Sequence, residues 1–172
     1  MEMKPVKVYI CWTRGKAFVS WLIRKLDGGR FNHVLLRFVF ADGGPLIYES
    51  HIGTGVAISP SEQLMEAYLS GKVEDFCEKL ITDNQDEAKE IWDRCRKMHG
   101  KKYDVLRIIT YYLWIKLTHR KNKKVLKIHD PNRYTCNEFV IEGANIGGND
   151  FSLTIEPLFK YFWGHPSKGD DE

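Results

Sequence analysis

The sequence predicts an α+β fold in which a small antiparallel sheet packs against helices. Residues 31–52 contain two β-rich apolar runs separated by the turn cluster "ADGG", which is typical of a hairpin. Residues 84–100 have the spacing of an amphipathic helix, and a capping-box pattern at Thr135 indicates a further helix. The 172 residues show no linker or repeat, so we expect one domain over 1–166 and a flexible acidic tail over 167–172.

Alternation and composition predict the elements of the first third of the chain. Residues 6–12, "VKVYICW", read as a strand, and residues 17–26 follow with helical spacing of apolar side chains. The strongest strand pattern is "FNHVLLRFVF" (31–40), "PLIYESHI" (45–52) forms the second half of the hairpin, and "GVAIS" (55–59) is a short third strand. The apolar face expected for the first helix consists of Phe18, Trp21, Leu22 and Leu26.

The middle of the chain predicts a helix, a strand and a longer helix. Residues 59–71 indicate a brief helix ending at Gly71, and residues 72–80 alternate as a strand. The helix over 84–100 has a capping box of Asn84 and Glu87 and ends at Gly100. Its predicted buried face, which makes Cys95 a core residue, is Ala88, Ile91, Trp92, Cys95 and Met98.

Residues 103–117, "YDVLRIITYYLWIKL", are apolar nearly all round, as in a helix buried on several sides. The run is too short, and too interrupted by Arg107 and Lys116, to span a bilayer. A basic segment without acids follows over 116–129. A solvated loop is the simplest interpretation of that segment. The alternative is a phosphate-bearing partner, either an anionic membrane surface bound through residues 104–127 or nucleic acid.

Composition limits the classes of protein that fit. The net charge of +3, from 26 basic and 23 acidic residues, does not predict a nucleic-acid partner. The four cysteines have no C-x-x-C spacing, and the chain begins without a secretory signal pattern. We therefore expect reduced thiols and a cytoplasmic protein.

Cys136 is the candidate nucleophile. If Thr135 is the N-cap, Cys136 is the first residue of a helix, where unpaired N–H groups and the helix dipole favour a thiolate. Glu138 opposes this, because it places a second negative charge in the same turn. The alternative is that Cys136 is a small buried apolar residue.

His33 is the candidate base, because it lies inside a strong strand pattern where an ionisable side chain needs a reason. Glu49 and His51 on the next strand compete as its partner. An odd number of loop residues between the strands would place all three side chains on one side, and a two-residue turn at Asp42 and Gly43 would not. The sequence allows both arrangements.

The order of "FNHVLLRF", "LIYESHIGTGV" and "RYTCNEFV" resembles the circularly permuted branch of the NlpC-type papain-like cysteine hydrolases, which are relatives of the lecithin retinol acyltransferase fold. The resemblance covers residues 31–142 and implies a papain-like fold. It also implies that Cys136 is the nucleophile, His33 the base and Glu49 the residue that orients the imidazole. Asn32 stands where that family often has serine, and residues 104–129 match none of its motifs.

The resemblance implies a hydrolase that cleaves an amide bond, as a peptidase or amidase acting on a peptide such as a cell-wall peptide. An acyl-ester or lipid hydrolase or acyltransferase is the alternative within the fold, and a catalytically silent membrane- or nucleic-acid-binding module is the alternative outside catalysis. The mechanism needs no cofactor and no metal, and Cys95 with His99 supplies too few ligands for zinc. A bacterial or bacterial-virus origin fits, while the oligomeric state and the exact substrate stay open.

Overall fold

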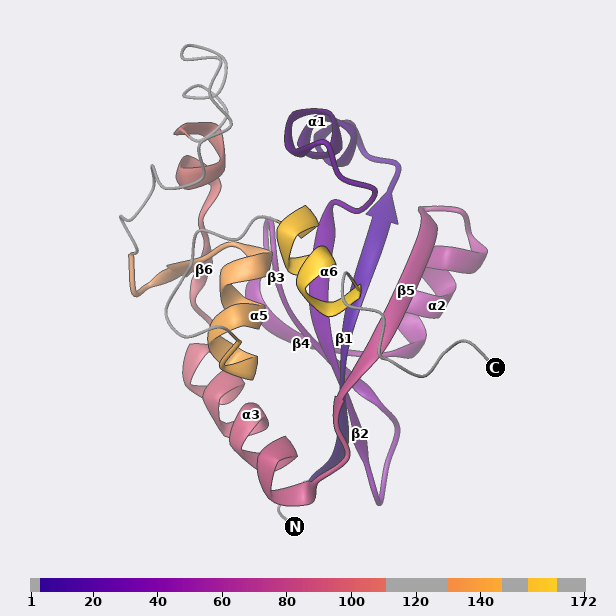
Figure 1. Cartoon of the computed structure of the whole chain (residues 1–172), viewed down its shortest axis with the longest axis vertical. Helices are drawn as coiled ribbons and strands as arrows, with labels where there is room; N and C mark the ends of the chain where they lie inside the picture. The colour runs from indigo at the N-terminus through magenta and orange to yellow at the C-terminus, as the bar shows by residue number, and fades with distance from the viewer. Residues whose placement is uncertain (1–3, 111–129, 147–154, 164–172) are drawn as a thin grey trace.

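A computed structural model describes residues 4–110, 130–146 and 155–163 (Figure 1). Its largest feature is a five-stranded sheet in the order β4-β3-β2-β1-β5, with every neighbouring pair antiparallel. The sheet packs with helices, which confirms the α+β class. The elements are β1 (Pro5–Gly15), α1 (Phe18–Asp27), β2 (His33–Phe40), β3 (Leu46–His51), β4 (Gly55–Pro60), α2 (Glu62–Leu69), β5 (Val73–Thr82), α3 (Gln85–Met98), β6 (Lys102–Tyr103), β7 (Arg133–Tyr134), α5 (Cys136–Ala144) and α6 (Ile155–Trp163).

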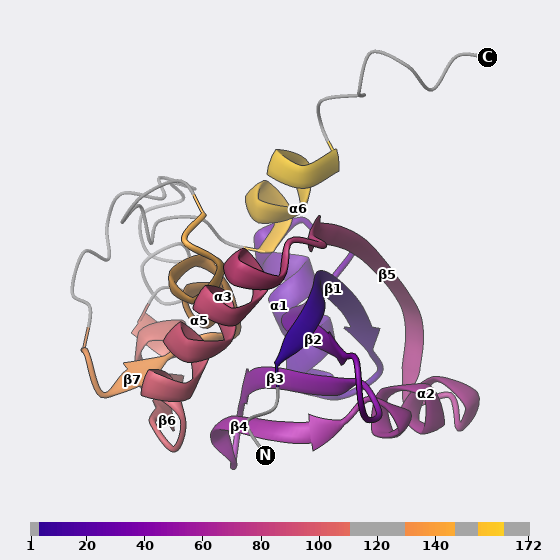
Figure 2. The ribbon, with the colours of Figure 1, turned by 90° about the horizontal axis from the view of Figure 1, so that it is seen from below.

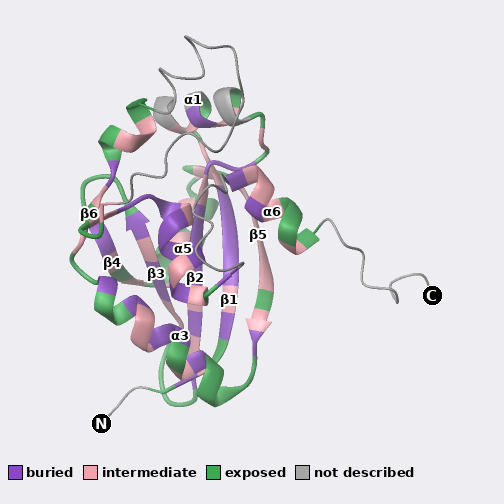
Figure 3. Ribbon diagram, turned by 60° about the vertical axis from the view of Figure 1, so that its left-hand side comes forward, coloured by how far each residue is buried: buried purple, intermediate pink, exposed green. Residues whose placement is uncertain are grey.

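The two faces of the sheet are covered unequally. Helices α3 and α5 lie side by side against one face, as two perpendicular views show (Figures 1 and 2). Their apolar side chains join those of β1, β2 and α6 in the main core. The other face has a small cluster centred on Cys11, Leu35 and Ile47, beside α2. Buried residues are concentrated on β1 and β2 in the middle of the sheet (Figure 3).

Helix α3 packs against the β2–β3 hairpin. Its N-cap is Asn84, whose Oδ1 accepts hydrogen bonds from the backbone N–H groups of Asp86 and Glu87 at 2.9 and 3.1 Å. The buried face is the one predicted from the sequence: Ala88, Ile91, Trp92, Cys95 and Met98. Trp92 makes edge contacts with Phe38 and Tyr48 at centroid distances of 5.0 and 5.5 Å, and such pairs contribute about 0.5–1.5 kcal/mol each beyond area burial.

The hairpin register resolves the alternatives that the sequence left open. Leu36 pairs with Tyr48 and Phe38 with Leu46, and residues 41–45 form the connection between β2 and β3. Five connecting residues make an odd loop, so residues of equal parity lie across from each other. The two-residue turn is excluded. Continuing the register by three residues places His51 opposite His33 and Glu49 diagonal to it.

Helix α1 corrects one detail of the sequence analysis. The helix forms where it was predicted, but Trp21, assigned to its apolar face, is 45% exposed. Among the α1 side chains that the structure describes, Ile23 is buried in the main core, whereas the predicted face residues Phe18, Leu22 and Leu26 have side chains outside the described part. The Trp21 ring instead lies under the Lys25 ammonium, 4.8 Å from the ring centroid, so a cation–π contact on the surface replaces burial.

The prediction of a buried helix over 103–117 is wrong for its described part. A helix does begin at residue 105, but Val105, Leu106 and Ile109 are 41%, 63% and 49% exposed. The side chain turned inward is Arg107, which is 11% exposed and pairs with a buried carboxylate. Residues 111–129, including the basic segment, and the tail over 167–172 lie outside the described residues. No helix of the described ranges is long and apolar enough to cross a membrane.

Candidate active site

His33 and Glu49 meet at the end of the β2–β3 hairpin farthest from its turn. His33 is the first residue of β2, and Glu49 lies two residues before the end of β3. The His33 Nε2 and the Glu49 Oε2 are 2.6 Å apart, which is a short, charge-assisted hydrogen bond. A carboxylate only accepts, so Nε2 carries the proton and donates. Glu49 therefore orients the imidazole and stabilises its protonated form.

Cys136 approaches the same imidazole from the start of α5. Thr135 is the N-cap, with an extended backbone (φ −76°, ψ 167°), and Cys136 is the first helical residue. The Cys136 side chain is close enough to His33 to raise the pKa of the imidazole. Because Nε2 is engaged by Glu49, Nδ1 is the ring nitrogen that remains available. The structure thus brings Cys136, His33 and Glu49 into one site, while their catalytic roles stay a prediction.

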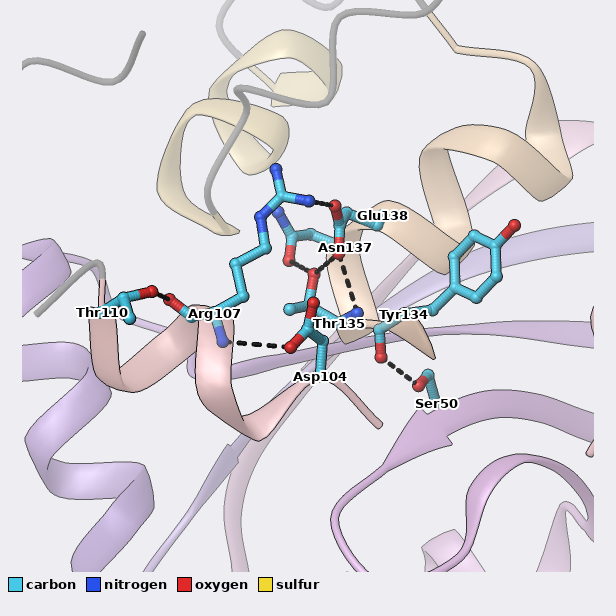
Figure 4. A network of polar contacts seen from close by, with 8 residues as sticks. All are labelled: Ser50, Asp104, Arg107, Thr110, Tyr134, Thr135, Asn137 and Glu138. Carbon is cyan, nitrogen blue, oxygen red and sulfur yellow. Dashed lines mark hydrogen bonds and ion pairs between the residues drawn. The ribbon is translucent and has the colours of Figure 1, made fainter. Parts of the chain in front are cut away.

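A buried serine helps to hold α5 at the hairpin. Ser50 lies between Glu49 and His51, is fully buried, and donates its Oγ hydrogen bond to the Tyr134 carbonyl at 2.7 Å (Figure 4). Tyr134 is two residues before Cys136. A small hydroxyl residue after Glu49 therefore has a direct structural purpose, since it ties the start of α5 to the strand that carries Glu49.

His51 is close to the site but makes a different contact. Its ring lies edge-on to that of His33, with centroids 5.7 Å apart and an interplanar angle of 88°. Its Nδ1 is 2.8 Å from the Ile52 carbonyl oxygen, so this nitrogen is the donor. Glu49, not His51, is thus the hydrogen-bond partner of His33.

The surroundings of His33 and Glu49 shift the pKa of each side chain toward its charged form. Burial lowers the pKa of His33, but hydrogen bonds to Cys136 and Glu49 outweigh it and raise the pKa to about 10. Burial raises the pKa of Glu49, and the hydrogen bond and charge of His33, with the charge of His51, outweigh it and hold the pKa below its usual value. Both shifts favour the charged forms at neutral pH, an imidazolium at His33 and a carboxylate at Glu49.

Asn32, which precedes His33, fixes the start of β2. Its Oδ1 accepts from the Gly15 backbone N–H at 2.8 Å and from Arg24 Nη1 at 3.0 Å, and Arg24 Nη1 is also 2.6 Å from the Gly15 carbonyl oxygen. The side chain of Asn32 thereby joins β1, α1 and the residue before the base. The longer amide reaches two donors, which gives a reason for asparagine in place of serine at this position.

A second network surrounds the first turn of α5 (Figure 4). Glu138 is 1% exposed, and its Oε2 accepts from the Thr135 backbone N–H at 2.9 Å and from Thr135 Oγ at 2.8 Å, as part of a capping box. Its Oε1 pairs with the Arg107 guanidinium. The sequence predicts that Glu138 disfavours a thiolate, but it gives no sign of Arg107, because no local pattern links residues 31 positions apart.

We expect iodoacetamide at about pH 7 to alkylate Cys136 before the other cysteines. Burial raises the pKa of Cys11 and Cys95 above the usual range and that of Cys77 to about 11, so these three thiols stay protonated. Peptide mapping by mass spectrometry after short exposure measures the order of labelling. Faster labelling of Cys77, which is the least buried of the three, would contradict the assignment of the nucleophile.

Metal binding has no support in the described part of the chain. Within residues 4–110, 130–146 and 155–163, no three His, Cys, Asp or Glu side chains lie close enough together to hold an ion. Cys95 lies in the main core, in contact distance of Gly143, rather than in an open site.

Comparisons with known proteins do not assign this chain to a family, so its function is inferred from the site. The sequence matches no model of a known protein family, and no curated protein is significantly similar to it.

Proposed function

We propose that this protein is a cysteine hydrolase with a circularly permuted papain-like fold, which cleaves an amide bond as a peptidase or amidase. The observation that carries the proposal is the short hydrogen bond between His33 and Glu49 at a site where the Cys136 side chain raises the pKa of His33. The three residues come from three separate elements and occur in the order base, carboxylate, nucleophile along the chain. A nucleophile in contact with a base, which is itself oriented by a third group, is the arrangement that covalent acyl transfer requires.

The reaction follows from the positions of these groups. The Cys136 thiolate attacks the carbonyl carbon, and a C–S bond forms as the carbonyl π electrons move to oxygen. The backbone N–H of Cys136, free of an intrahelical partner in the first turn, donates to this oxyanion. The His33 imidazolium protonates the departing amine as the C–N bond breaks. Water, deprotonated by the neutral imidazole, then attacks the thioester, releasing the carboxylic acid and restoring the thiolate.

An ester or lipid substrate is the second candidate, and one observation favours it. The helix beginning at residue 105 presents Val105, Leu106 and Ile109 to solvent, on the same short segment whose Arg107 contacts α5. An exposed apolar strip beside the nucleophile helix suits an acyl chain. A catalytically silent module is the weakest candidate, because binding alone does not require a buried thiol, a charged imidazole and a carboxylate in series.

Trapping the acyl-enzyme tests the proposal and separates the two substrate classes. The protein is mixed separately with cell-wall peptides and with phospholipid vesicles, quenched in acid and digested for mass spectrometry. We expect an added acyl mass on the peptide containing Cys136 with the peptides. The same mass gain from the lipids alone would replace the amide reaction with the ester reaction. No adduct with either, or adducts equally abundant in Cys136→Ala, would contradict covalent catalysis by Cys136.

A further inference from the structure

We propose, building on the proposed role of Cys136, that Arg107 is a positioning residue: its guanidinium neutralises Glu138, so that the capping carboxylate can hold the start of α5 without opposing the thiolate. Arg107 does not touch the reacting atoms. It acts through Glu138, from a segment 31 residues earlier in the sequence.

The first step is the position of Glu138. It lies in the first turn of α5, two residues after Cys136, and is 1% exposed. Two donors on Thr135, the backbone N–H and the hydroxyl, bond its Oε2. Two hydrogen bonds to one oxygen fix the orientation of the carboxylate. They also set the geometry of the N-cap and hence the direction of the Cys136 side chain.

The negative charge of Glu138 opposes a thiolate at Cys136. An ionised Glu138 uses the same helix terminus that would stabilise a thiolate, and two anions in one buried turn repel each other. Water screens this repulsion poorly, because the carboxylate has almost no contact with solvent. Without a counter-charge, the capping box would make Cys136 a poorer nucleophile.

Arg107 supplies a positive charge to Glu138. Arg107 is 11% exposed and pairs with Glu138 Oε1, the oxygen that the Thr135 bonds leave available. Asp104 fixes the turn that carries Arg107: its Oδ1 accepts from the Arg107 backbone N–H at 3.0 Å, and its own N–H donates to the Tyr134 carbonyl at 3.2 Å. Figure 4 shows the arginine reaching across from this turn to the start of α5. The segment is thus built to present one positive charge to Glu138.

A charge-swap cycle on the whole protein tests this with the pH midpoint of Cys136 alkylation by iodoacetamide. Arg107→Met removes the guanidinium charge from Glu138 and should move the midpoint up by about one pH unit, which corresponds to about 10-fold slower labelling below it. Glu138→Gln keeps a side chain able to cap and removes the negative charge from the first turn of α5 while the Arg107 charge stays, so the midpoint should move down. The double variant should return near the wild type, and Arg107→Lys should stay there.

Opposite shifts of the two single variants are the result that a merely structural role would not give. Single variants that shift in the same direction, or not at all, would overturn the proposal while labelling of Cys136 in the wild type continued to support the hydrolase. Wild-type protein in which Cys136 is not the reactive thiol would overturn both. If Arg107→Met does not fold by circular dichroism, Glu138→Gln decides alone: an unchanged or raised midpoint rejects the proposal.

Discussion

Cys136→Ser is expected to lower kcat by more than about 10⁴-fold on the amide substrate identified by adduct trapping, with folding intact. A serine hydroxyl is far harder to ionise than a thiol, so the imidazolium of His33 cannot be paired with a comparable nucleophile. The substitution is nearly isosteric, which suits a side chain that is 3% exposed. Steady-state kinetics measures the loss, and circular dichroism with thermal melting verifies the fold.

The losses of kcat caused by substituting Cys136 and His33 should not multiply in the double variant. His33→Gln removes the base and should cost a similar factor, because a thiol without a base and a base without a thiol fail at the same step. The double variant should therefore be about as slow as either single variant. Cys77→Ser is the matched control, since Cys77 is a half-buried thiol on β5 outside the site, and it should keep its activity within about 2-fold. Independent, multiplying losses from Cys136 and His33 would show that they do not act as a unit.

Much of the fold could be predicted because local patterns coincide with the tertiary structure. The face of α3 is an example: five side chains at helical spacing predict a buried stripe, and all five are buried. The β2–β3 hairpin is another, because two β-rich runs around a turn cluster have few alternatives. In both cases the energy that decides the structure, burial of apolar area, is already encoded in the order of residue types.

The site could be predicted only in part, because its geometry depends on the exact loop length and on contacts between residues distant in sequence, which local patterns do not determine. The loop length that puts Glu49 diagonal to His33 differs from a shorter turn by a few residues of similar turn propensity. The inward position of Arg107 reversed the expectation for its helix, since pairing with buried Glu138 outweighed the exposure of its apolar neighbours. Electrostatic partners that are distant in sequence leave no periodic signal.

Glu49→Gln is expected to lower kcat by roughly 10-fold to 10⁴-fold, whereas His51→Gln should change it little. Glu49 accepts a hydrogen bond from the Nε2–H group of His33 at 2.6 Å and so leaves Nδ1 available to act as the base. A glutamine has no charge to stabilise the imidazolium, and its amide can instead donate to Nε2, which would place the ring proton on Nδ1 and block the base. His51 offers only an edge-on ring contact, and its Nδ1 is occupied by the Ile52 carbonyl.

The pH dependence of kcat/KM distinguishes a loss of orientation from a loss of folding. Glu49 raises the pKa of His33 against the effect of burial, so removing its charge should narrow the pH range over which the thiolate–imidazolium pair persists, by lowering its upper limit. His51→Gln should leave that limit in place. An active Glu49→Gln together with an inactive His51→Gln would mean that His33 changes partner in the working enzyme, through the register that already places His51 directly opposite it.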